Sequence, residues 1–497
     1  MPSAEESFNP PPDLTPDAPL ARYLPPELSR ILKKLSESGR PLLVGGCVRD
    51  WLLGLRTEEF DIEVFGLDYV SLLRILRPFG ATDLVGKQFG VVKVRVDGQS
   101  FDFSLPRREI KTGKGHRGFD VQPDPHLPVE RAARRRDFTL NSISWDPQSG
   151  EIIDPLGGVR DLRNQCLRHA GEAFAEDPLR VLRAFQLAAR FRLTLAPETG
   201  ALCRSIRHTF EDLPRERIWG EWEKWAARSV APARGLEVLK ETGWLSCFPE
   251  IEALDGVPQD PEWHPEGDVW QHTLHCVDSL AAMEEWRAAA PAKRRDLMLA
   301  VLAHDFGKTV TTERAEKNGV LRWVSPRHET EGGKLAATFL ERIGAPNATR
   351  SFVIPLVENH LFHIHTQDAP SPGAIRRLAR RLAPASIDDL CLVMLADARG
   401  RPPRTERNPP GIESLREGAR KLEIDARAPK PILQGRHLMA EGLKPGPHFR
   451  EILDTLFEAQ LDGAFSNEEE ALRYLHRFLA DHQSHPGDPP KQRQPES

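Results

Sequence analysis

Residues 41–66 read PLLVGGCVRDWLLGLRTEEFDIEVFG, and this stretch decides the fold of the chain. Its first apolar residues, 42–44, predict a short strand, and VRDWLLG, residues 48–54, predicts the opening of a helix. Gly45 and Gly46 lie between them and predict a tight turn, because glycine adopts backbone conformations closed to other residues. Such a turn lets backbone N–H groups approach a phosphate closely.

Two carboxylates follow on a second predicted strand, FDIEVF. Asp61 and Glu63 are two positions apart, so their side chains point to one face of the strand. Adjacent carboxylates repel unless a cation lies between them, and Mg²⁺, which binds carboxylates together with substrate phosphates, suits that position. A Gly-Gly pair alone indicates an ordinary turn, and Asp-x-Glu alone a solvated strand face. Together, in this order and spacing, they favour a nucleotidyl-transfer site.

Length and composition bound the class of protein. With 497 residues the chain is expected to form three or four domains. It has no run of 18 apolar residues and no apolar segment in its N-terminal stretch, so we expect neither a membrane span nor a signal peptide. Its six cysteines include no CxxC pair, which argues against a zinc finger or disulfide framework and suits a reducing, cytoplasmic location.

The charge of the chain is unevenly distributed. The net charge of −5 does not indicate a nucleic-acid binder, but residues 107–137 hold nine Lys or Arg against five Asp or Glu. A local basic segment is expected of a phosphate-handling surface, and a solvated loop would share this pattern.

The pattern along the chain predicts an α+β fold. Short strand-like runs alternate with helical ones up to about residue 167, and the pattern beyond Asp177 is helical almost to the end. VGKQFGVVKVRV and QSFDFSL predict paired strands that turn at Asp97-Gly98. The helical pattern breaks where Pro, Gly and charge collect, near 255–266, 400–411 and 427–431. The expected domains are a disordered Pro-rich tail (1–27), a head (28–167), a helical neck (168–255), a third domain (256–405), a helical tail (412–483) and a disordered end (484–497).

Further polar residues fit a transfer site. Asp102 in SFDFSL alternates with buried positions and would supply a third carboxylate from a neighbouring strand. The arginines 134–136 offer bidentate partners for phosphate, and Asp137 and Asn141 would position them or the sugar.

The segment EDPLRVLR, residues 176–183, predicts a helix start, with Asp177 as N-cap and Pro178 at the first helical position. Arg180 and Arg183 lie one turn apart on that helix. An acceptor and a guanidinium donor near each other can also read the polar edge of a nucleobase. Capping and base reading are compatible roles for Asp177.

These motifs closely resemble bacterial tRNA nucleotidyltransferases (CCA-adding enzymes) and poly(A) polymerases, class II of the polymerase-beta-like superfamily. The resemblance implies a polymerase-beta-like head with a mixed sheet, followed by all-α neck, HD and tail modules. It also implies Mg²⁺ on Asp61 and Glu63, where many members have Asp at the second position. The matching pieces are GGCVRD (45–50), DIE (61–63), RRDFTLN (135–141), EDPLRVLR (176–183) and PRERIWGEWEK (214–224).

The same resemblance implies which residues bind the nucleotide. Asp177 and Arg180 would select the incoming base without a nucleic-acid template, and Arg217 and Glu221 would support that helix. The other residues implied to contact or position the nucleotide are Gly45, Gly46, Arg49, Arg136, Asp137, Asn141 and Arg183.

A second constellation of His and Asp residues lies in the helical part of the chain. His and Asp on packed helices predict a metal site that activates water against phosphate. The pattern resembles the HD phosphohydrolase domain, whose members of this kind hydrolyse 2′,3′-cyclic or 2′-phosphates. The implied ligands of a divalent metal of unspecified identity are His272, His304, Asp305 and Asp397, with His328 and His360 as ligands of a second metal.

The sequence therefore predicts an enzyme that adds CMP and AMP to the tRNA 3′ end from CTP and ATP with Mg²⁺, with HD phosphohydrolase activity. Its partners would be the tRNA 3′ end, CTP and ATP, without a membrane or an obligatory protein partner. Gly446 and Pro447 in the tail begin a helix that would either contact RNA phosphates or serve only as a structural hairpin.

Rival interpretations stay open at this point. The head segment has Gln88 where poly(A) polymerases have a basic residue, whereas TGKGHRGF, residues 112–119, resembles the mobile loop of enzymes that reach the A step. Poly(A) synthesis and A-only or CC-only addition are thus alternatives. So is a nucleotide phosphohydrolase with a non-catalytic, RNA-binding head. A small-molecule nucleotidyltransferase fits the Asp-x-Glu strand but not the long helical half.

Overall fold

The structure, a computed structural model, describes residues 19–57, 59–83, 91–111, 119–362, 370–404 and 408–483. Gln88, residues 112–118 of the predicted mobile loop (112–119) and the segment from 484 onward lie outside the described residues. The chain forms two compact units, each described by itself below. The first comprises the described residues up to Gly256 with Val277–Met298 and Phe339–Ala345; the second comprises Val257–Cys276, Leu299–Thr338 and the described residues from Pro346 onward.

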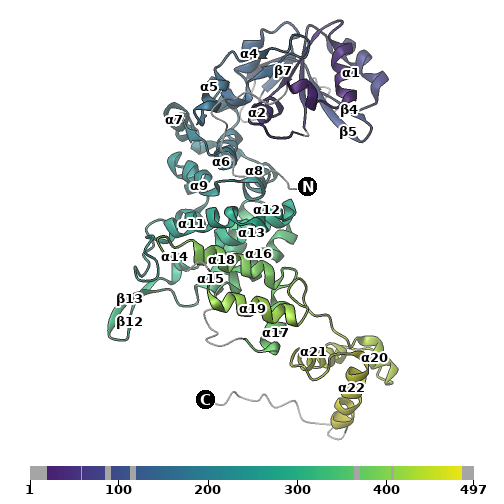
Figure 1. Ribbon diagram of the computed structural model, residues 1–497, viewed down its shortest axis with the longest axis vertical. Coiled ribbons are helices and arrows are strands. Elements are labelled where there is room, and N and C mark those ends of the chain that lie inside the picture. Colours follow the sequence, from purple (N-terminus) through teal and green to yellow (C-terminus); the bar gives the residue numbers. More distant parts are fainter. Residues whose placement is uncertain are drawn as a thin grey trace. The chain divides into compact units, whose positions relative to one another are not determined.

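The first unit contains a mixed sheet, in the purple and blue part of Figure 1. Its seven strands have the order β3-β4-β5-β2-β1-β8-β9. Strand β1 (Arg40–Val44) runs antiparallel to β2 (Asp61–Phe65), and β2 runs parallel to β5 (Gln99–Ser104). The predicted strands around the glycine pair and the carboxylates are confirmed. The other strands of this sheet are β3 (Ala81–Asp83), β4 (Val91–Val96), β8 (Ser144–Trp145) and β9 (Ile152–Ile153), and β6 (Arg107–Lys111) pairs separately with β7 (Phe119–Pro123).

The predicted hairpin between β4 and β5 is confirmed. Asp97 and Gly98 have φ angles of 48° and 79°, the left-handed conformation that a two-residue turn between twisted strands requires. The sequence predicts disorder up to residue 27, but the described structure begins earlier. Leu20 is fully buried in a 3-10 helix (Leu20–Tyr23), and burying an apolar side chain favours order over disorder. Helix α1 (Pro26–Leu35) follows and buries one apolar face.

The neck of the first unit is mainly helical. Helix α6 (Leu179–Phe191) packs against α8 (Arg215–Arg228) and α9 (Pro232–Glu241). Phe185 of α6 lies 5.4 Å from the ring of Trp225, stacked upon it, in a fully buried aromatic core. Further helices of this unit are α2 (Gly46–Leu52), α3 (Tyr69–Leu76), α4 (Val129–Ala133), α5 (Gly158–Arg163), α7 (Pro197–Ser205), α10 (Pro249–Glu252) and α12 (Glu284–Ala288).

The remaining helices carry the second constellation and the tail. Helix α18 (Ile387–Arg399) starts with a capping box between Ser386 and Asp389 and is buried over most of its length. In the described part of the chain, no helix is long and apolar enough to span a bilayer. The other helices are α11 (Val269–Ala282), α13 (Pro291–Ala303), α14 (Lys308–Thr311), α15 (His328–Arg342), α16 (Asn347–Asn359), α17 (Pro372–Leu382), α19 (Pro410–Lys421), α20 (Gly435–Ala440), α21 (His448–Leu461) and α22 (Glu468–Gln483).

The expectation of purely α-helical modules after the head needs correction. Strands β10 (Cys166–Leu167) and β11 (Thr194–Leu195) form a short parallel pair, and β12 (Glu313–Lys317) and β13 (Val320–Val324) form a hairpin. The hairpin turns at residues 318 and 319, an Asn-Gly pair with φ angles of 52° and 75°. Asn-Gly favours this turn strongly, which is the physical reason for the hairpin.

Candidate functional site

The sheet register brings the predicted carboxylates of the head together. Asp61 on β2 pairs in register with Asp102 on β5, and Glu63 pairs with Ser104. The alternate residues Phe101 and Phe103 are buried, so the expected separation of the two faces of β5 is confirmed. Asp61 and Asp102 line one hollow of about 800 Å³ that is open to solvent.

Basic side chains compensate the carboxylates in this structure. Arg136 Nη2 lies 3.3 Å from Glu63 Oε2, and Lys93 Nζ lies 3.2 Å from Asp102 Oδ1. Desolvation of its carboxylate, together with the charge of Asp102, raises the pKa of Asp61, although part of this residue stays in contact with solvent. A raised pKa in a carboxylate cluster is the electrostatic condition that a bound cation would relieve.

The glycine turn is shaped by its neighbours. Gly45 has a φ of 77°, and a Cβ at this position would lie 3.1 Å from Arg136 Nη1 and 3.9 Å from Asp61 Oδ2. A side chain there would therefore be strained and would crowd both charged groups. Helix α2 begins at Gly46, two residues before the start predicted at Val48.

Four residues predicted to contact or position the nucleotide form a buried polar network instead of facing the hollow together. Arg49 Nη1 donates to Asn141 Oδ1 over 2.6 Å, and Asn141 Nδ2 donates to Asp137 Oδ1 over 3.0 Å. Arg183 Nε then donates to Asp137 Oδ2 over 2.6 Å. Burial opposes ionisation of Asp137, but the Arg183 guanidinium and the Asn141 hydrogen bond outweigh it and lower its pKa to about 2.

This network joins the head to the first neck helix, both within the first unit. Arg49 is only 4% exposed, and its guanidinium also lies over the ring of Phe191 at 4.5 Å. Asp50 accepts from Arg49 and from Arg190 of α6. Charged groups therefore join α2 to α6; Arg49 and Asp50 among them are buried, and Arg190 is half-buried.

The start of α6 differs slightly from the prediction. Pro178, not Asp177, occupies the N-cap position, but Asp177 Oδ1 still accepts a hydrogen bond from the Leu179 backbone over 3.2 Å. Its other oxygen accepts from Arg217 of α8 over 2.8 Å. Arg217 was expected to support this helix, and this contact joins it to the residue just before the helix.

Arg180 and Glu221 are engaged elsewhere. Arg180 donates to the backbone carbonyls of Ala173 and Arg135 over 2.6 and 2.8 Å. Glu221 is buried, and its direct partner is Lys224 at 2.8 Å rather than a residue of α6. The structure thus places Asp177 just before α6 and Arg180 and Arg183 in its first two turns, each with a different partner.

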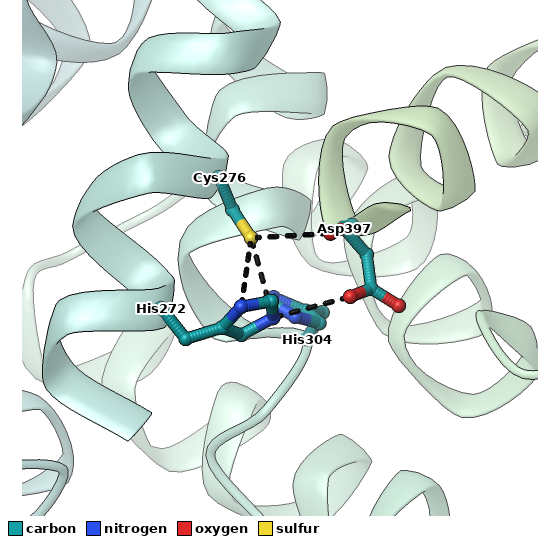
Figure 2. Close-up of side chains that lie close together, drawn as sticks. All are labelled: His272, Cys276, His304 and Asp397. Carbon is teal, nitrogen blue, oxygen red and sulfur yellow. Dashed lines mark hydrogen bonds and ion pairs between the residues drawn. The ribbon is translucent and has the colours of Figure 1, made fainter. Parts of the chain in front are cut away.

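The second constellation gathers buried side chains in the second unit. Ligand-type atoms lie within 4.8 Å of one another in three groups among the described residues, whereas Asp61, Glu63 and Asp102 do not form such a group. Figure 2 shows the side chains of the first group around one point. The groups are His272, Cys276, His304 and Asp397; His264, Glu266 and His272; and Asp305, His328 and His360.

Asp305 lies between the first and third of these groups. Its Oδ2 is 3.3 Å from His304 Nε2 and 3.6 Å from His272 Nε2. Its Oδ1 is 3.3 Å from His328 Nε2 and 3.8 Å from His360 Nε2. Each carboxylate oxygen therefore faces a different pair of imidazoles, and all six predicted HD residues are brought together.

The imidazoles are held so that Nε2 faces the centre. The Nδ1 atoms of His304, His328 and His360 lie 2.7 to 2.8 Å from the backbone carbonyls of the residues three positions earlier. His272 Nδ1 lies 2.7 Å from Glu266 Oε1. Metal-binding histidines are held in this way by outer partners, which fixes the tautomer.

The donor set fits a metal ion. His304 Nε2 is buried and makes no hydrogen bond of acceptable geometry, an arrangement that is costly unless a ligand satisfies it. Burial lowers the pKa of His360 to about 3, so this imidazole is neutral and able to ligate. Asp305 and Cys276 raise the pKa of His304 to about 10 against the effect of burial, so a metal would replace a proton there.

Sequence reasoning missed three features of this centre. Cys276 lies one helical turn after His272. A CxxC pattern does not detect this i, i+4 spacing of a histidine and a cysteine. Glu266 holds both His264 and His272. Arg401, one turn after Asp397, pairs with its carboxylate.

Comparison with known proteins finds a matching family for the head and another for the region that holds the His and Asp residues. Residues 42–168 match the poly A polymerase head domain family, and residues 269–400 match the HD domain family. The multifunctional CCA protein of Xanthomonas campestris is 36% identical over 423 residues, which cover 83% of this chain and 95% of that protein. The chain belongs to the multifunctional CCA protein family. The member from Nitrosococcus oceani is 36% identical over 413 residues, 81% of this chain and 93% of that protein.

Solved structures agree with the fold of this family. The Bacillus stearothermophilus CCA-adding enzyme in complex with CTP matches 93% of this chain and 100% of its own, with a TM-score of 0.62 and 24% identity. The Thermotoga maritima CCA-adding enzyme complexed with tRNA matches 93% and 97%, with a TM-score of 0.55 and 18% identity. The predicted α+β fold, a head with a mixed sheet followed by helical modules, is thereby confirmed.

Proposed function

We propose that this chain adds CMP and AMP to the tRNA 3′ end from CTP and ATP. The observation that carries the proposal is 36% identity to multifunctional CCA proteins over 83% of the chain, combined with Asp61 and Asp102 in register at one hollow. The ribose 3′-oxygen attacks the α-phosphorus, its proton passes to solvent, and the bond to the departing pyrophosphate breaks.

Asp61, Glu63 and Asp102 would hold Mg²⁺ in this reaction. The ion, when bound, supplies charge stabilisation for the attacking and leaving oxygens. Arg136, whose guanidinium lies 3.3 Å from Glu63, would bind the triphosphate, whose oxygens match its forked donors.

Asp177 and Arg180 would select the base, with Arg217 fixing the Asp177 carboxylate. The buried network through Asp137 and Arg49 would position α6 against the glycine turn without touching the nucleotide itself. This role differs from direct contact because both residues are almost fully buried, at 7% and 4% exposure.

The second centre would hydrolyse phosphate esters, such as 2′,3′-cyclic or 2′-phosphates. His272, His304 and Asp397 would hold one divalent metal, His328 and His360 a second, and Asp305 lies where one oxygen could reach each. A bound metal would supply an activated water and polarise the phosphoryl group. Against the effect of burial, His304 and Lys308, which lies 2.7 Å away, hold the pKa of the Asp305 carboxyl well below its usual range.

Stepwise extension tests the transfer proposal. The purified chain is incubated with tRNAs that end before the first C, before the second C or before the A, with each nucleoside triphosphate separately. Addition of C, C and A at the respective ends supports CCA synthesis. Addition of A alone, of C alone or of long A tails would instead establish A-only, CC-only or poly(A) activity.

A further inference from the structure

Cys276 shares the first ligand group of the second centre. It follows His272 by one turn of α11, so both side chains project from the same face of the helix. Its Sγ lies 3.3 Å from His272 Nε2, and both residues are fully buried (Figure 2). The thiol therefore faces the same point as the imidazole rather than an apolar core.

The spacing of the four donor atoms suits a single ion. His272 Nε2 lies 3.1 Å from Asp397 Oδ1, and all four ligand atoms of the group lie within 4.8 Å of one another. An ion bonded at about 2.0 to 2.3 Å to N, O and S ligands requires donor separations of roughly 3 to 4.6 Å. The His304 Nε2 atom, buried without a hydrogen-bond partner, independently indicates a missing ligand at this point.

Helix α18 makes room for the sulfur. A Cβ at Gly400, the residue that caps this helix, would overlap the Cys276 Sγ atom. The same helix carries Asp397 three residues earlier. The C-terminal turn of α18 thus provides both the Asp397 carboxylate and, at Gly400, the space that the Cys276 thiol occupies.

We propose that Cys276 is an additional, sulfur ligand of the ion held by His272, His304 and Asp397. This inference rests on the proposed metal centre and goes beyond its expected His and Asp ligands. On binding, the thiol loses its proton to solvent and the sulfur bonds to the ion. A thiolate favours Zn²⁺ and Co²⁺ over the harder Mn²⁺ and Mg²⁺, so it biases this position toward softer metals. The neighbouring Asp305, His328 and His360 group contains no sulfur.

Cobalt substitution tests the proposal on the full chain. The protein is stripped of metal with a chelator and titrated with Co²⁺ while its absorption is recorded. A sulfur ligand gives a thiolate-to-cobalt charge-transfer band in the near ultraviolet. We expect this band in the unaltered protein and in Cys391→Ser, but not in Cys276→Ser. Cys391, on α18, is a matched control because it is buried like Cys276 but belongs to none of the ligand groups among the described residues.

Competition between metals gives a second readout. We expect the ratio of Zn²⁺ to Mn²⁺ affinity to fall at least about tenfold in Cys276→Ser and to stay constant in Cys391→Ser. Co²⁺ bound to the unaltered protein with visible absorption but without the sulfur band would overturn the inference while leaving the metal centre intact. Failure to bind Co²⁺ at all would overturn the centre and the sulfur ligand together. Neither outcome depends on a variant that folds.

Discussion

Arg136 is the residue whose partner we expect to change most on substrate binding. It lies 3.3 Å from Glu63 and beside the glycine turn, where a triphosphate would approach. Arg136→Gln should raise the KM for CTP about 10- to 100-fold, because a charge-assisted hydrogen bond contributes roughly 1.5 to 3 kcal/mol. Steady-state kinetics measure this. Arg30→Gln is the control, because Arg30 of α1 pairs with Glu27 and lies outside the predicted site. Equal KM values for the two variants would contradict the role.

Asp137 should make stability depend on pH. Its pKa of about 2 lies below the ordinary value near 3.9, so its contribution to the unfolding free energy is complete above about pH 4 and is lost as the pH falls toward 2. Asp137→Asn should therefore cost roughly 2 to 3 kcal/mol at pH 7 and clearly less at pH 3. Urea unfolding at both pH values checks this. A difference between the proteins that is constant with pH would argue against an ionised Asp137 in the fold.

The sequence identified individual residues better than their partners. Local spacing placed Asp61, Glu63 and Asp102 on strand faces, because strand geometry alone decides that. It did not reveal that Arg49 bonds to Asn141, 92 positions away, or that Cys276 joins the metal ligands. Such contacts depend on how elements pack, and no local pattern encodes packing.

At the scale of elements, α8 should control the base-reading end of α6 through Arg217 and Asp177. Arg217→Leu frees the Asp177 carboxylate to move, so discrimination for CTP and ATP against UTP and GTP should fall by about 5- to 30-fold. The ratio of kcat/KM values measures it. The control is Lys240→Gln on α9, which removes an exposed ion pair between Lys240 and Asp255. It should leave the ratio of kcat/KM values unaltered. An unchanged ratio in Arg217→Leu would remove α8 from base selection.

Turn chemistry explains which elements the sequence predicted. The hairpin at Asp97-Gly98 was recognised because alternating residues flank its turn residues. The hairpin β12–β13 was missed, although Asn318 and Gly319 give an equally strong signal. The strand residues 313–317, ERAEK, are mostly charged and show no alternation of apolar and polar residues. The flanking helical pattern therefore predicts helix here instead of a strand.

At the scale of the whole molecule, we expect each compact unit to carry out one reaction. The acidic residues of the first and the His and Asp ligands of the second lie in separate compact units. The length of the chain predicts several domains, and the order of the motifs predicts the order of those domains along the chain. A substitution that abolishes the reaction of one unit should therefore leave the reaction of the other unit intact.

A paired comparison of two variants tests this central claim most directly. Purified Asp61→Asn and His304→Ala are each assayed for CMP incorporation into tRNA lacking its CCA end and for metal-dependent hydrolysis of a 2′,3′-cyclic nucleotide. Asp61→Asn should lose incorporation by about 1,000-fold, since a metal-binding carboxylate supplies several kcal/mol, and should keep hydrolysis; His304→Ala should show the reverse. Incorporation that persists in Asp61→Asn would contradict the transfer site, and hydrolysis that persists in His304→Ala would contradict the second centre.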